Sequence, residues 1–91
     1  MLQIAQIRSE HGALLLPAGD PYDREIVFQE AEFRARRHGT VGLQIGSAEM
    51  RVACSEVYSR VKCTGCLRLV GNVSYIVHGH RLCTNCAKRS V

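Results

Sequence analysis

Two short apolar runs begin the chain, at residues 2–7 and 13–16, and the polar segment Ser9-Glu10-His11-Gly12 lies between them. Runs of this length around a turn-forming segment favour a β-hairpin, and a helical arm is the alternative. After Pro17, Asp20 and Pro21 are typical of the N-cap and the first turn of a helix. The pattern therefore predicts an N-terminal hairpin followed by a helix.

This helix is expected over residues 21–38, with Gly39 as its C-terminal stop. Acidic residues gather in its first turns and arginines in its last turn, which matches the helix dipole. Its apolar residues fall on two sides: Tyr22, Ile26 and Phe33 on one, and Val27, Phe28, Ala31 and Ala35 on the other. We therefore expect the helix to be contacted on both sides.

Three glycines make residues 39–46 a loop or a short strand, in which Val41, Leu43 and Ile45 alternate. The apolar spacing then becomes helical, along a face made of Met50, Ala53, Cys54, Val57, Tyr58 and Val61. The pattern predicts a second helix over residues 48–60 with Ser47 as its cap. The strand alternative rests on the alternation of Met50, Val52 and Cys54.

Two C-x-x-C pairs stand in the last third of the chain, sixteen residues apart: Cys63 with Cys66, and Cys83 with Cys86. Paired cysteines at this separation are typical of a tetrahedral zinc site. A redox dithiol or another metal is the alternative, and His80 is an alternative ligand in place of one cysteine. Cys54 is interpreted as a small core residue.

The residues between the two pairs resemble a hairpin, because residues 67–70 and 73–77 flank the turn-forming Gly71 and Asn72. A short helix is expected after the second pair, at Ala87, Lys88 and Arg89, which completes a treble-clef or ribbon-like zinc module. The predicted fold is thus small α+β. A mostly helical α+β region covers residues 1–61, and a four-cysteine zinc-finger module covers residues 62–91 and packs on it.

Composition and charge add a basic C-terminal part to this picture. Residues 1–50 hold five Arg and seven acidic residues, a balance of −2, whereas residues 51–91 hold seven Lys or Arg and one acidic residue, a balance of +6. Such a surface suits nucleic acid or an acidic protein groove. Because no signal peptide or membrane-length apolar run is present, we expect a cytoplasmic protein without a membrane partner.

No enzyme motif is present: the chain lacks a phosphate loop, a nucleophile elbow, an H-E-x-x-H helix and a catalytic carboxylate pair. A zinc ion held by four thiolates has no open position for water. The expectation is therefore one structural zinc ion in a protein that is not an enzyme.

The run Asp20-Pro21-Tyr22-Asp23-Arg24, with a basic approach into the first C-x-x-C pair, resembles the DksA/TraR family of bacterial RNA polymerase regulators over residues 20–89. That family has an acidic D-x-x-D tip at a helical turn and a helix that leads into a four-cysteine zinc finger. The resemblance implies that Asp20 and Asp23 form the tip, which enters the secondary channel of the polymerase near its catalytic magnesium. The alternative role of both residues is to cap the first helix.

Three hypotheses of function follow from these features. The first is a transcription regulator that binds RNA polymerase. The alternative is a zinc-stabilised protein–protein interaction module, or an inhibitor of another nucleic-acid-processing complex of the kind that mobile elements encode. The third is direct nucleic-acid binding through the basic C-terminal face, and self-association through the N-terminal strands is a further expectation. The predicted partner-binding residues are Asp20, Asp23, Arg24, Arg60, Lys62, Arg68, Arg81, Lys88 and Arg89.

Overall fold

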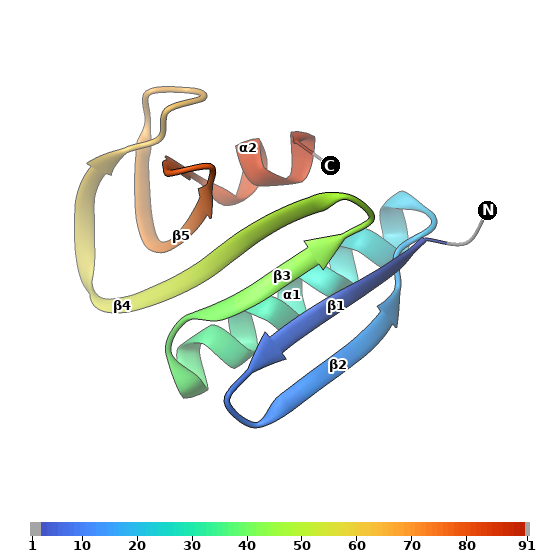
Figure 1. Cartoon of the computed structure of the whole chain (residues 1–91). Helices are drawn as coiled ribbons and strands as arrows, with labels where there is room; N and C mark the ends of the chain where they lie inside the picture. Colours follow the sequence, from blue (N-terminus) through green and yellow to red (C-terminus); the bar gives the residue numbers. More distant parts are fainter. Residues whose placement is uncertain (1–2, 91) are drawn as a thin grey trace.

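An antiparallel sheet and one long helix make up most of the computed structural model, which describes residues 3–90 except the side chains of residues 56–60. In these residues the sheet has six strands in the order β2-β1-β3-β4-β5-β6 (Figure 1). The elements in chain order are β1 (Ile4–Ser9), β2 (Gly12–Pro17), α1 (Pro21–His38), β3 (Val41–Ile45), β4 (Ala48–Lys62), β5 (Leu69–Val77), β6 (His80–Leu82) and α2 (Thr84–Arg89).

The predicted N-terminal hairpin is confirmed. Strands β1 and β2 pair from Ile4 opposite Pro17 to Ser9 opposite Gly12. Gly12 has φ +116°, a conformation open to glycine, and this allows the chain to reverse after Ser9. β2 is an edge strand, where the missing N–H of Pro17 leaves no gap in the hydrogen bonding of the sheet.

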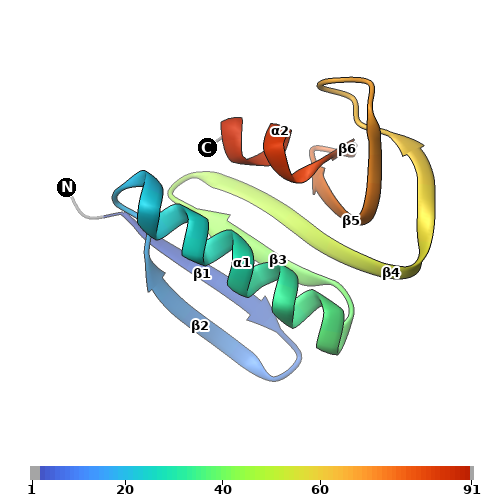
Figure 2. The same ribbon diagram turned by 180° about the vertical axis from the view of Figure 1, so that it is seen from behind.

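The first predicted helix is confirmed as α1, which covers one face of the sheet (Figure 2). Its N-cap is Asp20, and Gly39 at its C-terminal end has φ +88°. One apolar side is buried against the sheet, as Val27, Phe28, Ala31 and Ala35. The other side is open, with Tyr22 75%, Ile26 41% and Phe33 50% exposed, so the expected contact on both sides is wrong.

The helix predicted over residues 48–60 is wrong, because this segment forms the long strand β4. Met50 and Val52 point into the core and Cys54 is half-buried, which is the alternation of a strand. A tight turn at Gly46 brings β4 beside β3, whose backbone groups it pairs. On its other side β4 pairs with the distant strand β5, and the two pairings outweigh the helical spacing of the apolar residues. Two of these residues, Val57 and Tyr58, have side chains outside the described set.

The hairpin turn predicted at Gly71 and Asn72 is also wrong. β5 continues through both residues, and the chain reverses at His78 and Gly79, whose φ values are +49° and +82°. Positive φ at both central residues is the geometry of a tight two-residue hairpin turn. Gly71 also has positive φ, but it lies within β5, where the register between β4 and β5 shifts at a bulge.

The fold class is α+β, but the predicted architecture needs correction. In place of a mostly helical first region, one sheet runs from the N-terminal hairpin to β6, and α1 lies across it. The predicted boundary between residues 61 and 62 falls within β4, so the division into two parts stays a prediction. Between α1 and Cys63 the chain forms β3 and β4, whereas the DksA-like arrangement implies a continuous helix there. Within residues 3–90, neither helix is long and apolar enough to cross a membrane.

Candidate metal centre

The four cysteines come from two places that the β5–β6 hairpin brings together. Cys63 and Cys66 belong to the turn that follows β4, and Cys83 and Cys86 belong to the start of α2. All four Sγ atoms lie within 4.8 Å of one another. Cys63 is fully buried, whereas Cys66 lies at the surface. The predicted ligand set is therefore assembled in space, and His80 is not part of the cluster.

The spacing of these sulfur atoms fits a zinc ion. Zinc bound to four thiolates at about 2.3 Å places the sulfurs about 3.8 Å apart at the corners of a tetrahedron. The Sγ atoms of Cys66 and Cys83 are 3.7 Å apart. Because every pair lies within 4.8 Å, shifts of about 1 Å or less complete the tetrahedron. Four sulfur ligands then fill the coordination shell.

The turn around the first pair is held by backbone hydrogen bonds. The N–H of Leu67 donates to the carbonyl of Cys63 at 2.9 Å, and the N–H of Thr64 donates to the carbonyl of Arg81 at 2.9 Å. The second bond ties the turn to β6. The N–H of Gly65 donates to the Sγ of Cys63 at 3.3 Å, a contact that stabilises a thiolate.

The surroundings of the thiols also prepare the site for a cation. Burial of Cys63 opposes ionisation, but hydrogen bonds from the backbone N–H groups of Cys83, Cys66 and Gly65 outweigh it and lower the pKa of its thiol to about 6. Hydrogen bonds with Cys63 and Cys83, followed by burial, raise the pKa of Cys86 to about 12. The thiol of Cys63 therefore ionises more readily than that of Cys86, and metal binding displaces the protons that ligand thiols hold.

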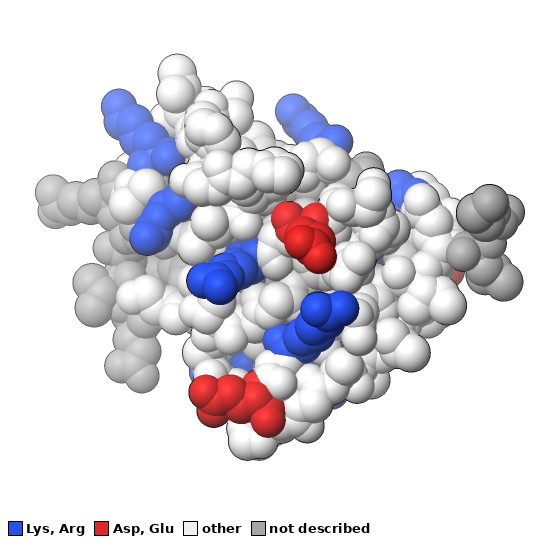
Figure 3. All heavy atoms as spheres, in the orientation of Figure 1, with Lys and Arg blue, Asp and Glu red and all other residues white. Residues whose placement is uncertain are grey.

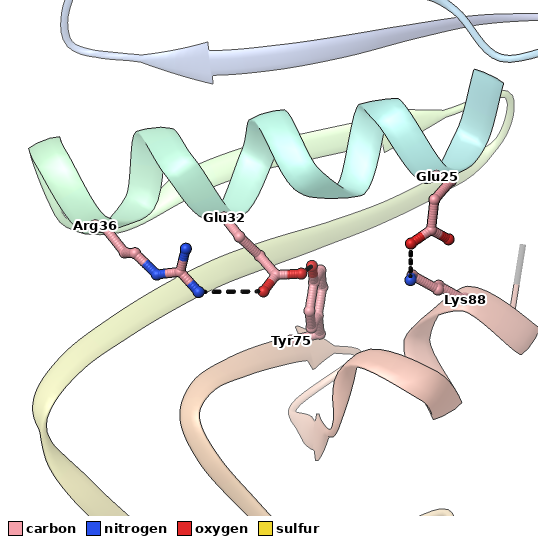
Figure 4. Close-up of polar contacts among 5 residues, drawn as sticks. All are labelled: Glu25, Glu32, Arg36, Tyr75 and Lys88. Carbon is pink, nitrogen blue, oxygen red and sulfur yellow. Dashed lines mark hydrogen bonds and ion pairs between the residues drawn. The ribbon is translucent and has the colours of Figure 1, made fainter. Parts of the chain in front are cut away.

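Contacts between α1 and the C-terminal segment attach this site to the rest of the fold (Figure 4). The hydroxyl of Tyr75 on β5 donates to Glu32 Oε2 at 2.7 Å, and its ring meets the ring of Phe28 edge-on at 5.5 Å. Lys88 on α2 donates to Glu25 Oε1 at 2.6 Å. Burial and then the bond to Glu32 raise the pKa of Tyr75, which keeps its hydroxyl protonated.

The predicted partner-binding residues are not gathered in one place. Asp20 caps α1 by accepting a 2.8 Å hydrogen bond from the N–H of Asp23, as the alternative interpretation predicted. Arg24 donates to the carbonyl of Ala18 and to Gln3, and Lys88 is paired with Glu25. The other predicted cations with described side chains are exposed: Lys62, Arg68, Arg81 and Arg89. The side chain of Arg60 lies outside the described residues.

The sequence analysis did not predict that Arg8 and Arg51 would share the exposed face of the sheet. Arg8 on β1 and Arg51 on β4 are exposed on the sheet face opposite α1, beside the exposed Arg81. An alternating strand pattern in residues 48–53 would have predicted that Arg51 lies on the exposed face of a sheet. The sequence analysis instead assigned this segment to a helix. No family model, curated protein or solved structure matches the chain.

Proposed function

We propose that this protein is a non-enzymatic binding module whose C-terminal part is held together by one structural zinc ion. The observation that carries the proposal is the cluster of four cysteine Sγ atoms within 4.8 Å. Four thiolates satisfy zinc completely, so the metal serves to connect segments of the chain and leaves no coordination position for a substrate. The closed donor set therefore supports a structural role.

A structural metal has a clear physical purpose in this chain. With 91 residues, the protein buries little apolar surface relative to its size, and small domains of this kind commonly recruit metals. The zinc ion would connect the turn after β4 to α2, whose Ala87 is buried in the core. By linking these two segments, the metal would stabilise the C-terminal end of the sheet.

The experiment is elemental analysis of the purified chain, followed by chelation. We expect one zinc ion per chain and loss of cooperative unfolding when a strong chelator removes it. Restoring zinc should restore the native circular-dichroism spectrum. A metal-free chain that keeps the same thermal unfolding transition would exclude the structural role.

RNA polymerase, the partner that the family resemblance implies, stays a prediction. The position of Asp20 and Asp23 at the start of α1 supports this prediction, because a protein partner can contact a turn at a helix end. The test is binding of purified polymerase to the chain and to its Asp23→Ala variant. Asp23 uses only its backbone N–H in the cap, so the variant should keep the fold. Equal binding by both chains would exclude an acidic tip at this position.

A further inference from the structure

The face of the sheet opposite α1 carries a row of arginines. In strand register, Arg8 on β1 lies opposite Gly42 on β3, and Gly42 lies opposite Arg51 on β4. The same row continues through Ile76 on β5 to Arg81 on β6. Directly paired residues in an antiparallel sheet point to the same face, so the three arginines share one surface. We call Arg8, Arg51 and Arg81 the arginine row.

These side chains are exposed and run across the sheet. Figure 3 shows Lys and Arg side chains along a diagonal of this face, with acidic groups to either side of it. Neighbouring strands are about 4.8 Å apart, so the four strand spacings from β1 to β6 separate Arg8 from Arg81 by up to roughly 19 Å. That length suits a chain-like ligand with several charges better than a single small anion.

Uncharged side chains hold Arg8, although the carboxylate of Glu49 lines the same groove as Arg8 and Arg51. Arg8 donates from Nε and Nη2 to Gln6 Oε1 at 2.9 and 2.7 Å, and from Nη2 to Gln44 Oε1 at 3.4 Å. These neutral amides orient the guanidinium group without cancelling its charge. None of the three arginines forms an ion pair with a residue whose side chain the structure describes.

Gly42 leaves room between two of these arginines. A groove of about 600 Å³ lies along this face, and Arg8, Gly42, Gln44, Glu49, Arg51 and His78 are among its lining residues. Because Gly42 has no side chain, the floor between Arg8 and Arg51 is bare backbone. A ligand can therefore approach the sheet closely while both guanidinium groups contact it.

We propose that the arginine row binds the sugar–phosphate backbone of a nucleic acid, which rests on the proposed function as a zinc-stabilised binding module. Guanidinium groups form paired hydrogen bonds with phosphate oxygens, and a repeated anion matches a repeated cation. The imidazole of His78 is the only aromatic ring among the described residues that line the groove, so stacking on bases contributes little. Binding is accordingly independent of sequence, and backbone charge supplies the affinity.

Binding to a labelled 20-nucleotide strand and to the matching duplex tests this proposal over a range of salt concentrations. The zinc-loaded chain should bind at least one of the two, and affinity should fall as salt rises. Arg8→Gln, Arg51→Gln and Arg81→Gln combined should weaken binding at least about tenfold and reduce the slope of log K against log salt by about 2 to 3. The corresponding triple change to Lys should retain most of the salt dependence.

A charge-matched control distinguishes binding by the arginine row from a general effect of the protein's positive charge. Arg34→Gln, Arg36→Gln and Arg37→Gln remove the same charge from α1, on the other side of the sheet, and should leave affinity within about threefold of the unmodified chain. An equal loss in both triple variants would overturn the proposal, as would unchanged binding after substitution of the row.

Gly42 provides a sharper test within the groove. A Cβ atom there would lie 3.8 Å from Arg8 Cβ and 3.9 Å from the Arg8 carbonyl oxygen, which is ordinary contact, so a side chain can be accommodated. Gly42→Glu and Gly42→Gln have the same shape and differ in charge. The Glu variant should bind at least about tenfold more weakly than the Gln variant, because its carboxylate would lie between two arginines. Equal affinities would contradict a phosphate site here.

Two further outcomes locate the source of a failure. A poly-glutamate chain of equal charge that competes as well as the oligonucleotide would overturn the proposal in favour of an acidic protein partner. A chain that holds one zinc ion and unfolds on chelation, but binds neither oligonucleotide, would overturn this proposal and leave the proposed function intact. A folded chain without zinc would instead contradict the proposed function.

Discussion

The hydroxyl of Tyr75 donates a 2.7 Å hydrogen bond to Glu32, a residue 43 positions earlier in the chain. Tyr75 on β5 is fully buried, and its ring also meets the ring of Phe28 on α1. Glu32 is held from its other side by Arg36, whose Nη2 lies 3.9 Å from Glu32 Oε1 (Figure 4). This bond joins the helix that covers the sheet to the β5–β6 hairpin, and the two cysteine pairs flank that hairpin in the chain.

Removal of the hydroxyl by Tyr75→Phe should lower the free energy of unfolding by about 1 to 2 kcal/mol. The ring and its packing remain, so the loss reports the hydrogen bond and the partner group left unsatisfied. Urea denaturation of the zinc-loaded chain measures it. Tyr22→Phe is the control, because Tyr22 is 75% exposed and should change stability by less than about 0.5 kcal/mol. Equal stability of the two variants would show that the bond contributes nothing.

Stability should also depend on Tyr75 at alkaline pH. Folding raises the pKa of this phenol above the ordinary value of about 10, through burial and the bond to Glu32. The folded chain therefore holds the proton more tightly than the unfolded chain, and this contribution is complete below about pH 10 and is lost as pH rises above it. The stability difference between the unmodified chain and Tyr75→Phe should stay constant up to about pH 10 and shrink as pH rises from about 10 to 11.5. A constant difference across this range would contradict the prediction.

Short sequence patterns correctly predicted the features of the fold that depend on residues close together in the chain. The N-cap at Asp20, the stop at Gly39 and the alternation of Val41, Leu43 and Ile45 all act within a few residues. The C-x-x-C spacing of the cysteines likewise predicted, without knowledge of the fold, the four side chains that lie together as a candidate metal site. These features could be predicted because their physical causes lie close together along the chain.

The features that were mispredicted depend on distant partners. β4 is a strand because β3 and β5 pair with it on either side. The spacing of its own apolar residues contains no information about these partner strands. Gly71 was expected to make a turn, but its positive φ serves a bulge against β4. The arginine row depends on the register of five strands, so it could not be recognised before that register was known.

Each cysteine of the cluster should be necessary for metal binding. Cys66→Ser should reduce bound zinc well below one ion per chain and lower the thermal unfolding temperature by more than about 5 °C. Cys54→Ser is the matched control, because Cys54 is half-buried on β4 and does not belong to the cluster. Elemental analysis and thermal unfolding of both variants measure these effects. Loss of zinc in the Cys54 variant would mean that the ligand set is wrong.

Gly65 should be sensitive to the smallest side chain. A Cβ atom at this position would lie 3.0 Å from Cys86 Sγ and 3.3 Å from Cys86 Cβ, so Cys86 must give way by a few tenths of an ångström. A ligand held by a metal ion has little freedom to do so. Gly65→Ala should weaken zinc binding roughly 10- to 100-fold, the usual cost of disturbing residues around a metal site. Competition with a chromophoric chelator measures the affinity.

Gly19→Ala is the control for this change, because a Cβ atom at Gly19 would have no neighbour within 4 Å. Its zinc affinity should equal that of the unmodified chain, so that any loss in the Gly65 variant reports crowding at the cluster and not a general effect of replacing glycine. Unchanged affinity in Gly65→Ala would mean that the turn after β4 can move away from α2 while all four sulfurs remain bound. The contact between Gly65 and Cys86 would then not limit the metal geometry.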